Sequence, residues 1–427
     1  MRVRRADDSG MSHAGATTSL TGVPAASGGA PPALQVWRQF ESRYSLLDAM
    51  VGEIVEAFAA CGWRVVEQAV HGPRLVLALN FPSDFDAFLR WARPADPACG
   101  VAHLVVDHPF ALPTGTIERL CTLPAYRLFM TGIDDRHLLG LRFPTIRHFT
   151  CMHGVPTSAL ADEREIEPSH SHTDASRGGR DLGVVVAGSI HSVTQIEDLV
   201  GTLPASLVGV AREAARVLVE SPGVTFTQAM DLVGPPGLFA VDQWRQLAAV
   251  WRVAIAIANR ERRLALVRAL RGLPVTIVGG EAWDEVCDGT TVRLGSVDYA
   301  QLPGVLRRAR VCVAWGATQF AMSTTERPLL SMASGCATIA EDRVVLRREF
   351  GSDGHAESSG LALYDARVPE RARELAETML ADPSACAVMG YAGRERIAAA
   401  HLWRHRVRGI LSAYANVPAL AGLVASR

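Results

Sequence analysis

The sequence predicts an α/β protein made of two doubly wound domains, each a parallel sheet covered by helices on both faces. Three observations support this fold class. Apolar runs of strand length alternate with helical segments along most of the chain. Many of these runs end in glycine or polar residues, as strands do at a ligand-binding sheet edge. With 427 residues, the chain is long enough for two hydrophobic cores.

The same patterns divide the chain into segments. A leader rich in Ala, Gly, Ser, Thr and Pro is predicted to be disordered, and a charged stretch with Pro, Ser and Gly reads as an interdomain linker. The predicted segments are the leader 1–33, the first Rossmann-like domain 34–156, the linker 157–180, the second Rossmann-like domain 181–410 with a helical insertion at about 194–270, and a C-terminal helix or tail 411–427.

The first domain begins with helical spacing from Gln35 to Ala60, which predicts an amphipathic helix. Strands and one helix follow. The predicted strands are 63–70, 74–81, 101–110, 126–133 and 146–154, and the helix is 83–94.

In the second domain, strands are predicted at 181–187, 273–280, 292–297, 311–316, 336–341 and 361–365. Glycines follow several of these runs, at Gly188, Gly279, Gly295 and Gly316, where they let the backbone turn sharply beside a ligand. None of them forms a GxGxxG or Walker A pattern, so a nicotinamide or P-loop ATP site is not indicated.

Composition narrows the class of function. Hydrophobic residues make up 48% and charged residues 20%, which is typical of a globular protein. The net charge of −1 gives no basic field for nucleic acid. No apolar run reaches the length of a bilayer span and no secretory signal is recognisable, which predicts a cytoplasmic protein, with peripheral membrane contact left open.

The eight cysteines form no CxxC pair and indicate neither a metal nor a redox motif. The sequence contains no lysine, so phosphate contacts must come from arginine, backbone amides or hydroxyls.

Residues 323–350 are the most informative stretch. Ser323, Thr324 and Thr325 are expected to cap a helix, with Glu326 in its first turn, and Gly335 is expected to stop it. An apolar strand follows and ends at 341–342. A polar helix start at the mouth of a parallel sheet suits a diphosphate or sugar ligand.

This stretch resembles the signature of group 1 glycosyltransferases of the GT-B type, and specifically that of the spore-maturation CgeB-like branch, whose members show S-x-x-E-R-x-x-x-A-M-A-x-G followed by an apolar strand and an acidic residue. The matching positions are Ser323, Glu326, Arg327, Met332, Gly335 and Asp342, and the similarity continues to the chain end through 361–411. The resemblance implies two Rossmann-like domains facing a central cleft. It also implies a bacterial-type enzyme that moves a sugar from a nucleotide-diphosphate sugar to a glycan, lipid-linked glycan or protein acceptor, with no bound metal or other cofactor, and a final helix that returns to the first domain.

The donor-binding residues expected from the motif and the glycine turns are Gly188, Ser189, Gly279, Ser323, Thr324, Glu326, Arg327 and Asp342. In the first domain the D-H-P and H-G elements resemble those of CgeB-like relatives, and they make Asp107, His108 and His153 candidates for the acceptor's base or for a donor contact. The alternative is that these histidines are structural. Asn80 and Asp134 are lesser candidates on the same sheet edge.

Several features have two readings. Met322 and Leu330 stand where the wider group has two glutamates eight positions apart, so that pair is absent, and Glu326 either holds ribose hydroxyls or only favours the helix dipole. The Asp84-Phe85-Asp86 triplet is better explained by helix capping than by a metal. Trp283, Trp315 and Tyr299 are better explained by core or rim packing than by flanking a nucleobase. His170 and His172 read as part of a solvated linker.

Two further functions remain open at this point. A GT-B epimerase would turn over a nucleotide sugar without an acceptor. A glycosyltransferase-like binding module would bind donor without turnover, and the missing glutamate pair and missing lysine keep that reading open.

Overall fold

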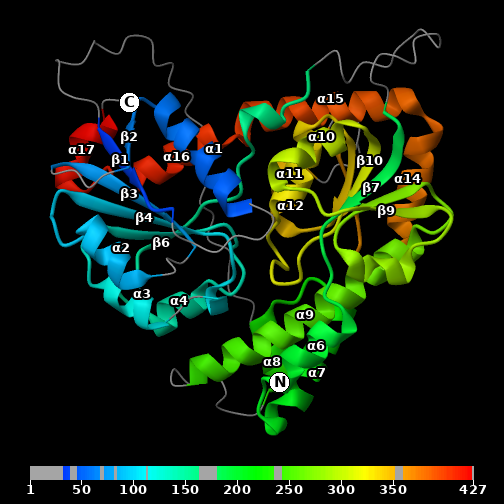
Figure 1. Cartoon of the computed structure of the whole chain (residues 1–427), viewed down its shortest axis with the longest axis horizontal. Helices are drawn as coiled ribbons and strands as arrows, with labels where there is room; N and C mark the ends of the chain where they lie inside the picture. The colour runs from blue at the N-terminus through cyan, green and yellow to red at the C-terminus, as the bar shows by residue number, and fades with distance from the viewer. Residues whose placement is uncertain are drawn as a thin grey trace, which may run out of the picture.

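Two lobes lie side by side, and an arm of helices extends from the second lobe (Figure 1). The computed structural model describes residues 32–38, 46–67, 72–80, 84–111, 114–162, 180–234, 243–351 and 359–425. The predicted leader, except its last two residues, and most of the predicted linker, including His170 and His172, lie outside the described residues.

The first lobe is a parallel six-stranded sheet in the order β2-β1-β3-β4-β5-β6. Its central strands are buried along their whole length, which explains why they read as continuous apolar runs. The strands are β1 Ala33–Val36, β2 Arg64–Val66, β3 Arg74–Leu79, β4 Cys99–Val105, β5 Tyr126–Met130 and β6 His148–Thr150. The helices are α1 Leu46–Ala60, α2 Phe85–Ala92, η1 Pro109–Ala111, α3 Thr114–Cys121, α4 His137–Arg142 and η2 Thr157–Ala159.

The predicted helix from Gln35 is wrong at its start. Residues 33–36 form β1, which pairs with β2 on one side and β3 on the other, and Gln35 is fully buried. The helix α1 begins only at Leu46. Four residues buried on both faces carry no alternation of polar and apolar side chains, so this strand gives no periodic signal.

The second lobe is also a parallel six-stranded sheet, in the order β12-β11-β10-β7-β8-β9. This is the Rossmann order, with its switch point between β7 and β10. The strands are β7 Leu182–Ala187, β8 Val275–Val278, β9 Thr291–Gly295, β10 Ala309–Ala314, β11 Ala337–Glu341 and β12 Leu361–Tyr364, each within or overlapping a predicted run. The helices are η4 Glu281–Val286, η5 Tyr299–Gln301, α10 Leu302–Arg307, α11 Glu326–Ala333, α12 Val344–Phe350, α14 Glu370–Ala381 and α15 Pro383–Ala400.

The helical stretch predicted between the first two strands of this sheet forms the arm. It consists of α6 Val193–Gly201, α7 Ala205–Glu220, α8 Phe226–Val233 and α9 Trp244–Ala269. The arm has its own hydrophobic core, which also includes Phe110 and Leu138 of the first lobe. The arm therefore bridges the two lobes, since α9 also leads directly into β8.

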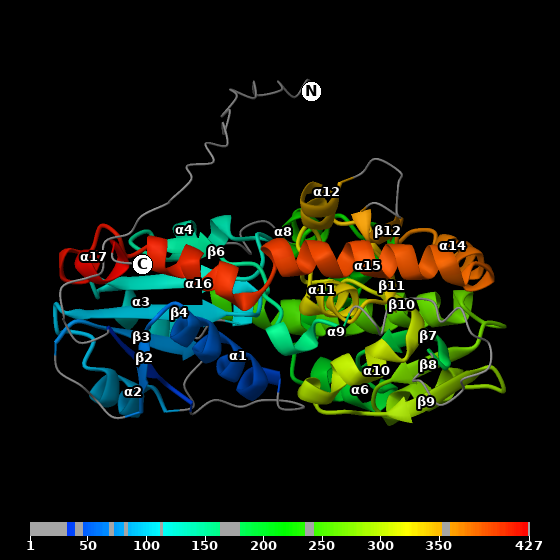
Figure 2. The same ribbon diagram turned by 90° about the horizontal axis from the view of Figure 1, so that it is seen from above.

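The end of the chain returns to the first lobe. Figure 2 shows α15, α16 and α17 running from the second lobe to the first. The chain crosses between the lobes just after His401. There Leu402 forms a parallel bridge with Val155, and α16 (Trp403–Ser412) begins at the next residue. Trp403 is buried in the first core and its Nε1 donates to Glu53 at 2.8 Å. The last helix, α17 Pro418–Ala425, lies near β4.

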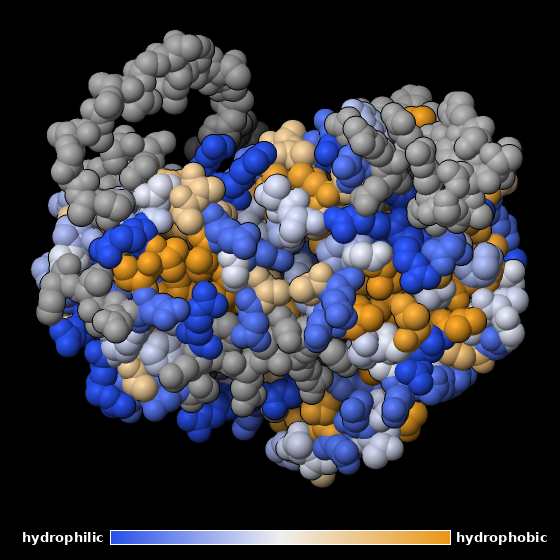
Figure 3. Space-filling view, turned by 45° about the horizontal axis from the view of Figure 1, so that its top comes forward, coloured by the Kyte–Doolittle hydropathy of each residue, from blue (hydrophilic) through white to orange (hydrophobic). Residues whose placement is uncertain are grey.

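On the face seen in Figure 3, hydrophobic patches on both lobes are bordered by hydrophilic residues. Within the described ranges, none of the helices combines the length and apolar character needed for a bilayer span.

A buried ion cluster connects the second sheet to the arm. Glu341, at the end of β11, accepts from Arg262 of α9 at 2.7 Å and is also paired with Arg343. Arg343 in turn donates at 2.8 Å to the carbonyl oxygens of Pro222 and Ala321. Burial would raise the pKa of Glu341, but Arg262 and Arg343 hold that pKa below its ordinary value.

We expect Glu341→Gln to lower the free energy of unfolding by about 3–5 kcal/mol, because it leaves two buried guanidinium groups without their carboxylate. The pKa of Glu341 is depressed in the folded chain, so its contribution is present above the unfolded pKa of about 4.3 and is lost as the pH falls. Urea unfolding between pH 3 and 7 measures both effects. Equal stability of the variant and the wild type at pH 7 would contradict this account.

Candidate active site

The carboxyl edge of the second sheet is closed by tight glycine turns. Gly188 follows β7 with φ of +139°, and a Cβ there would lie 2.7 Å from the Trp315 ring. A Cβ on Gly279 would collide with the carbonyl oxygen of Gly188 and approach the Trp283 ring. The Nε1 of Trp283 donates to the Gly188 carbonyl at 2.8 Å. Both glycines are thus required by close packing of the backbone at the switch point.

Core packing, which the sequence favours over a nucleobase flank for Trp283 and Trp315, is confirmed. Trp283 and Trp315 are fully buried, with ring centroids 5.5 Å apart in the second core. Tyr299 is also buried, in the neighbouring cluster of Leu302 and Leu306. All three residues therefore pack in the core.

Arg263 of α9 brings a positive charge to the switch point. Its guanidinium lies 5.2 Å from the centroid of the Trp315 ring and donates to the carbonyl of Ser189. Its Nε has no partner among the described residues. Burial, with a contribution from nearby Arg327, lowers the pKa of Arg263 to about 9, so the group stays charged at neutral pH. Sequence reasoning missed this residue, because it stands in an arginine-rich helix rather than at a strand end.

The signature helix α11 begins at Glu326 as predicted, but it is not capped as predicted. Thr325 is the N-cap residue, yet its side chain makes no capping bond, and its Oγ1 has no partner among the described residues. Thr324, also buried, donates its hydroxyl to the Thr325 carbonyl at 3.2 Å. Gly335 follows the helix with φ of +72°, which is the predicted stop.

Ser323 connects the two domains instead of capping the helix. Its hydroxyl accepts from the backbone N–H of Ile133 at 2.8 Å, and its own N–H donates to Asp134 at 3.2 Å. Asp134 also accepts from the N–H of Met322 at 2.6 Å. Because Ser323 and Asp134 are both nearly fully buried, these bonds fix the start of α11 against the first lobe.

Glu326, Arg327 and His153 form a polar group at the domain interface, in which Glu326 and Arg327 carry opposite charges. The Nε of Arg327 is 3.7 Å from Glu326. Burial would raise the pKa of Glu326, but Arg327, His153 and Arg263 hold that pKa below its ordinary value, so the carboxylate is ionised. His153 is buried, which lowers its pKa and keeps the imidazole neutral at pH 7.

Three buried polar atoms in this group and next to it lack partners among the described residues. They are His153 Nδ1 in the group, and Thr325 Oγ1 and Arg263 Nε beside it. Thr325 precedes Glu326 in the chain, and His153 and Arg263 both act electrostatically on the Glu326 carboxylate. Buried polar groups in native proteins nearly always have a partner. The arrangement is that of a polar binding site supplied by both domains.

Both ring nitrogens of His108 have hydrogen-bond partners within the protein. Its Nε2 lies 3.0 Å from Asp135, and its Nδ1 accepts from the N–H of Phe110 at 3.3 Å. The ring stacks on Trp251 of the arm with centroids 5.2 Å apart, and it is buried. This geometry fits the structural reading of His108 and leaves no ring nitrogen for proton transfer.

Asp107 is more available. It is partly buried, and Asn80 donates to it at 3.4 Å. Asn80 is itself held by accepting from the N–H of Val106 at 3.0 Å. Burial raises the pKa of Asp107, against the opposing effects of His108 and Asn80. The carboxylate therefore lies at the end of β4 with a raised affinity for protons.

Other predicted carboxylates are engaged locally. Asp342 is bound by Arg347 through two hydrogen bonds of 3.0 and 2.5 Å on the surface. Asp84 caps α2 by accepting from the N–H of Ala87 at 2.8 Å, which confirms the capping reading, and Asp86 pairs with Arg119. In the part of the chain that the structure describes, no group of three or more His, Cys, Asp or Glu residues is arranged to hold a metal ion.

Comparison with known proteins gives a family match for part of the chain. Residues 260–412 match the family described as glycosyl transferase-like. This range contains the end of α9 with Arg263, the strands β8 to β12, and the signature helix. No curated protein sequence matches the chain significantly.

Among solved structures, sucrose-phosphate synthase from Thermosynechococcus elongatus is similar with 12% identity and a TM-score of 0.49, over 91% of this chain and 100% of that one. HepE from Anabaena, solved in complex with UDP and glucose, has 10% identity and a TM-score of 0.49, over 90% and 99% of the two chains.

The prediction of two Rossmann-like domains is confirmed by the two parallel sheets. The prediction of a glycosyltransferase is supported by the family match over residues 260–412.

Proposed function

We propose that this chain is a GT-B glycosyltransferase that moves a sugar from a nucleotide-diphosphate sugar to a glycan, lipid-linked glycan or protein acceptor. The observation that carries this proposal is the group of Glu326, Arg327, Arg263 and His153 at the switch point. It combines two cations, an ionised carboxylate and unpartnered polar atoms, which is the chemistry that a sugar diphosphate needs.

Each residue has a proposed role in donor binding. Arg327 and Arg263 hold the diphosphate oxygens and stabilise the negative charge that develops on the leaving group. Glu326 accepts hydrogen bonds from hydroxyls of the ribose or the sugar. The unpartnered Nδ1 of His153 binds the donor from the side of the first domain.

Asp107 is the proposed base. The acceptor hydroxyl oxygen forms a bond to the anomeric carbon, and its proton passes to the Asp107 carboxylate. The bond from the anomeric carbon to the diphosphate breaks, and the nucleoside diphosphate leaves. The raised pKa of Asp107 supports this role, because a base works best when its pKa approaches the working pH.

We further propose that transfer needs no resident metal, since two arginines already supply positive charge at the site. Activity should then be unchanged by EDTA. The Arg327 that directly follows Glu326 supports assignment to the bacterial CgeB-like branch. The eight cysteines are free thiols, which supports a cytoplasmic location.

Thermal unfolding in the presence of UDP-, GDP-, dTDP- and ADP-sugars tests the proposed function. At least one of them should stabilise the chain, by about 2.7 kcal/mol when its concentration is 100 times its Kd. The matched control is Arg371→Gln, a surface arginine that pairs with Glu374 and should not alter the shift. No stabilisation by any of the four would sink the proposal. Donor turnover that yields an isomeric nucleotide sugar without acceptor would favour the epimerase.

A further inference from the structure

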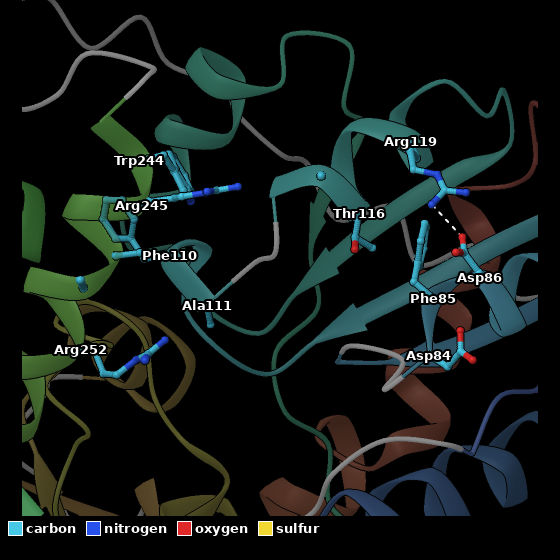
Figure 4. Close-up of a pocket in the computed structure, with 13 residues that line it drawn as sticks. Asp84, Phe85, Asp86, Phe110, Ala111, Thr116, Arg119, Trp244, Arg245 and Arg252 are labelled. Carbon is cyan, nitrogen blue, oxygen red and sulfur yellow. Dashed lines mark hydrogen bonds and ion pairs between the residues drawn. The ribbon is translucent and has the colours of Figure 1, made fainter. Parts of the chain in front are cut away.

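A cavity of about 1020 Å³ lies between the first lobe and the arm (Figure 4). One wall is α9, with Trp244, Arg245 and Arg252. The opposite wall belongs to the first lobe and carries Phe85, Thr116 and Arg119, and Phe110 and Ala111 of η1 lie between the two walls.

Two arginines give this cavity its charge. Arg245 and Arg252 are seven residues apart on α9, so they lie on one face of the helix about 10.5 Å apart along its axis. Figure 4 shows both side chains extending from the helix toward the wall that carries Thr116 and Arg119. No acidic partner of either guanidinium is found among the described residues.

The carboxylates that line the cavity are already engaged. Asp86 pairs with Arg119 at 2.9 Å, and Asp84 caps α2. Within the described residues, the guanidinium groups of Arg245 and Arg252 are therefore not neutralised across the cavity. Exposed arginines are ordinarily solvated, but here both are directed into one concave space rather than away from the surface.

Aromatic side chains lie on both walls of the cavity and between them. Phe110 and Trp244 are in contact, with ring centroids 4.8 Å apart, and both are nearly buried. Phe85 on the other side lies under the guanidinium of Arg119, 5.0 Å from its ring centroid. Apolar and aromatic walls with a few directed polar groups are typical of small-ligand sites.

Residues that line the cavity are close in sequence to the proposed base and to a donor-site residue. Phe110 follows Asp107 by three residues at the end of β4. On the other side, Arg252 precedes Arg263 by eleven residues of the same helix, which is about 16 Å along its axis. The chain segments that line the cavity therefore also hold the proposed base Asp107 and the donor-site residue Arg263.

We infer that this cavity is the acceptor subsite and that its ligand is a carbohydrate bearing an anionic group, a carboxylate or a phosphate, bound by Arg245 and Arg252. The inference rests on the proposed function, since it names the acceptor class of the same enzyme. The arginines hold the anion through charge-assisted hydrogen bonds, and the aromatic wall packs against the sugar.

Calorimetric titration of the full chain with three oligosaccharides tests this inference without any donor. One carries a uronic-acid carboxylate, one carries a phosphate monoester, and one is the matched neutral compound. We expect at least one of the anionic compounds to bind at least 10-fold more tightly than the neutral one, and the stronger of the two identifies the anion. Binding of the anionic compound should weaken as salt rises.

Arg245→Gln and Arg252→Gln should each weaken binding of the anionic oligosaccharide about 10-fold, since each removes one charge-assisted contact. Both are surface substitutions and should leave folding and nucleotide binding unchanged. Arg212→Gln, on α7 of the same arm and paired with Glu197, is the control that should change nothing.

Equal affinity for neutral and anionic compounds, no binding of either anionic compound, or unchanged affinity in both variants would overturn the inference. These results are distinct from failure of the proposed function, which shows as the absence of any nucleotide-sugar binding. If the chain binds a nucleotide sugar but shows no preference for an anionic oligosaccharide, the proposed glycosyltransferase function is kept and only the anionic acceptor class is excluded.

Discussion

Replacing Arg327 with glutamine should lower kcat/KM for sugar transfer by about 10²- to 10³-fold, the range seen when one preorganised donor to a developing charge is removed. The Arg327 side chain is 24% exposed, and its Nε lies 3.7 Å from the carboxylate of Glu326, outside close hydrogen-bonding distance. Its donors are therefore available to a diphosphate. Release of nucleoside diphosphate, measured with the donor found by the thermal screen, quantifies the loss.

Arg327→Lys is the matched variant. It keeps the charge but not the planar fork, so we expect a partial recovery of kcat/KM. Arg327 also helps to hold the pKa of Glu326 down, so unfolding curves of both variants must accompany the kinetics. Activity near that of the wild type in a folded Arg327→Gln protein would show that the donor site lies elsewhere.

Replacing Asp107 with asparagine should slow transfer by about 10²- to 10⁴-fold, the usual contribution of a general base. Asparagine is nearly the same shape, so the contact with Asn80 at 3.4 Å can be kept while the proton acceptor is lost. The affinity for donor should not change, because Asp107 is assigned to the acceptor side. Single-turnover measurement at saturating donor separates the chemical step from binding.

The pH dependence follows from the same residue. A base must be deprotonated, so wild-type activity should fall as the pH drops through the pKa of Asp107, which burial raises above its ordinary value. Asn80 lowers that pKa, so Asn80→Ala should move the acid limb to higher pH. An unchanged rate in Asp107→Asn, or an acid limb that Asn80→Ala does not move, would exclude Asp107 as the base.

Much of the second domain was predictable because its strands are buried apolar runs, bounded by glycine or polar residues that mark where each strand begins and ends. The strand β11 between Gly335 and Asp342 is an example, with a glycine stop before it and a polar end. The strand β1 was not predictable, because residues 33–36 are few and buried on both faces. Its place between β2 and β3 depends on tertiary pairing that no local pattern records.

The candidate site was predictable in part for the same reason. Glu326 and Arg327 come from a motif, and His153 from its position after a strand, and the structure brings the three together across the domain interface. Arg263 was missed, because nothing local distinguishes one arginine of α9 from its neighbours. The role of Ser323 was misread, because a hydroxyl before a helix predicts a cap, whereas its partner Ile133 is 190 residues away.

The structure of the chain in complex with the nucleoside diphosphate selected by the thermal screen tests the central claim most directly. The diphosphate oxygens should lie within hydrogen-bonding distance of Arg327 and Arg263, with Glu326 facing the ribose or the sugar side. A nucleotide bound away from the β7 to β10 switch point, or failure of any nucleotide to bind, would contradict the account.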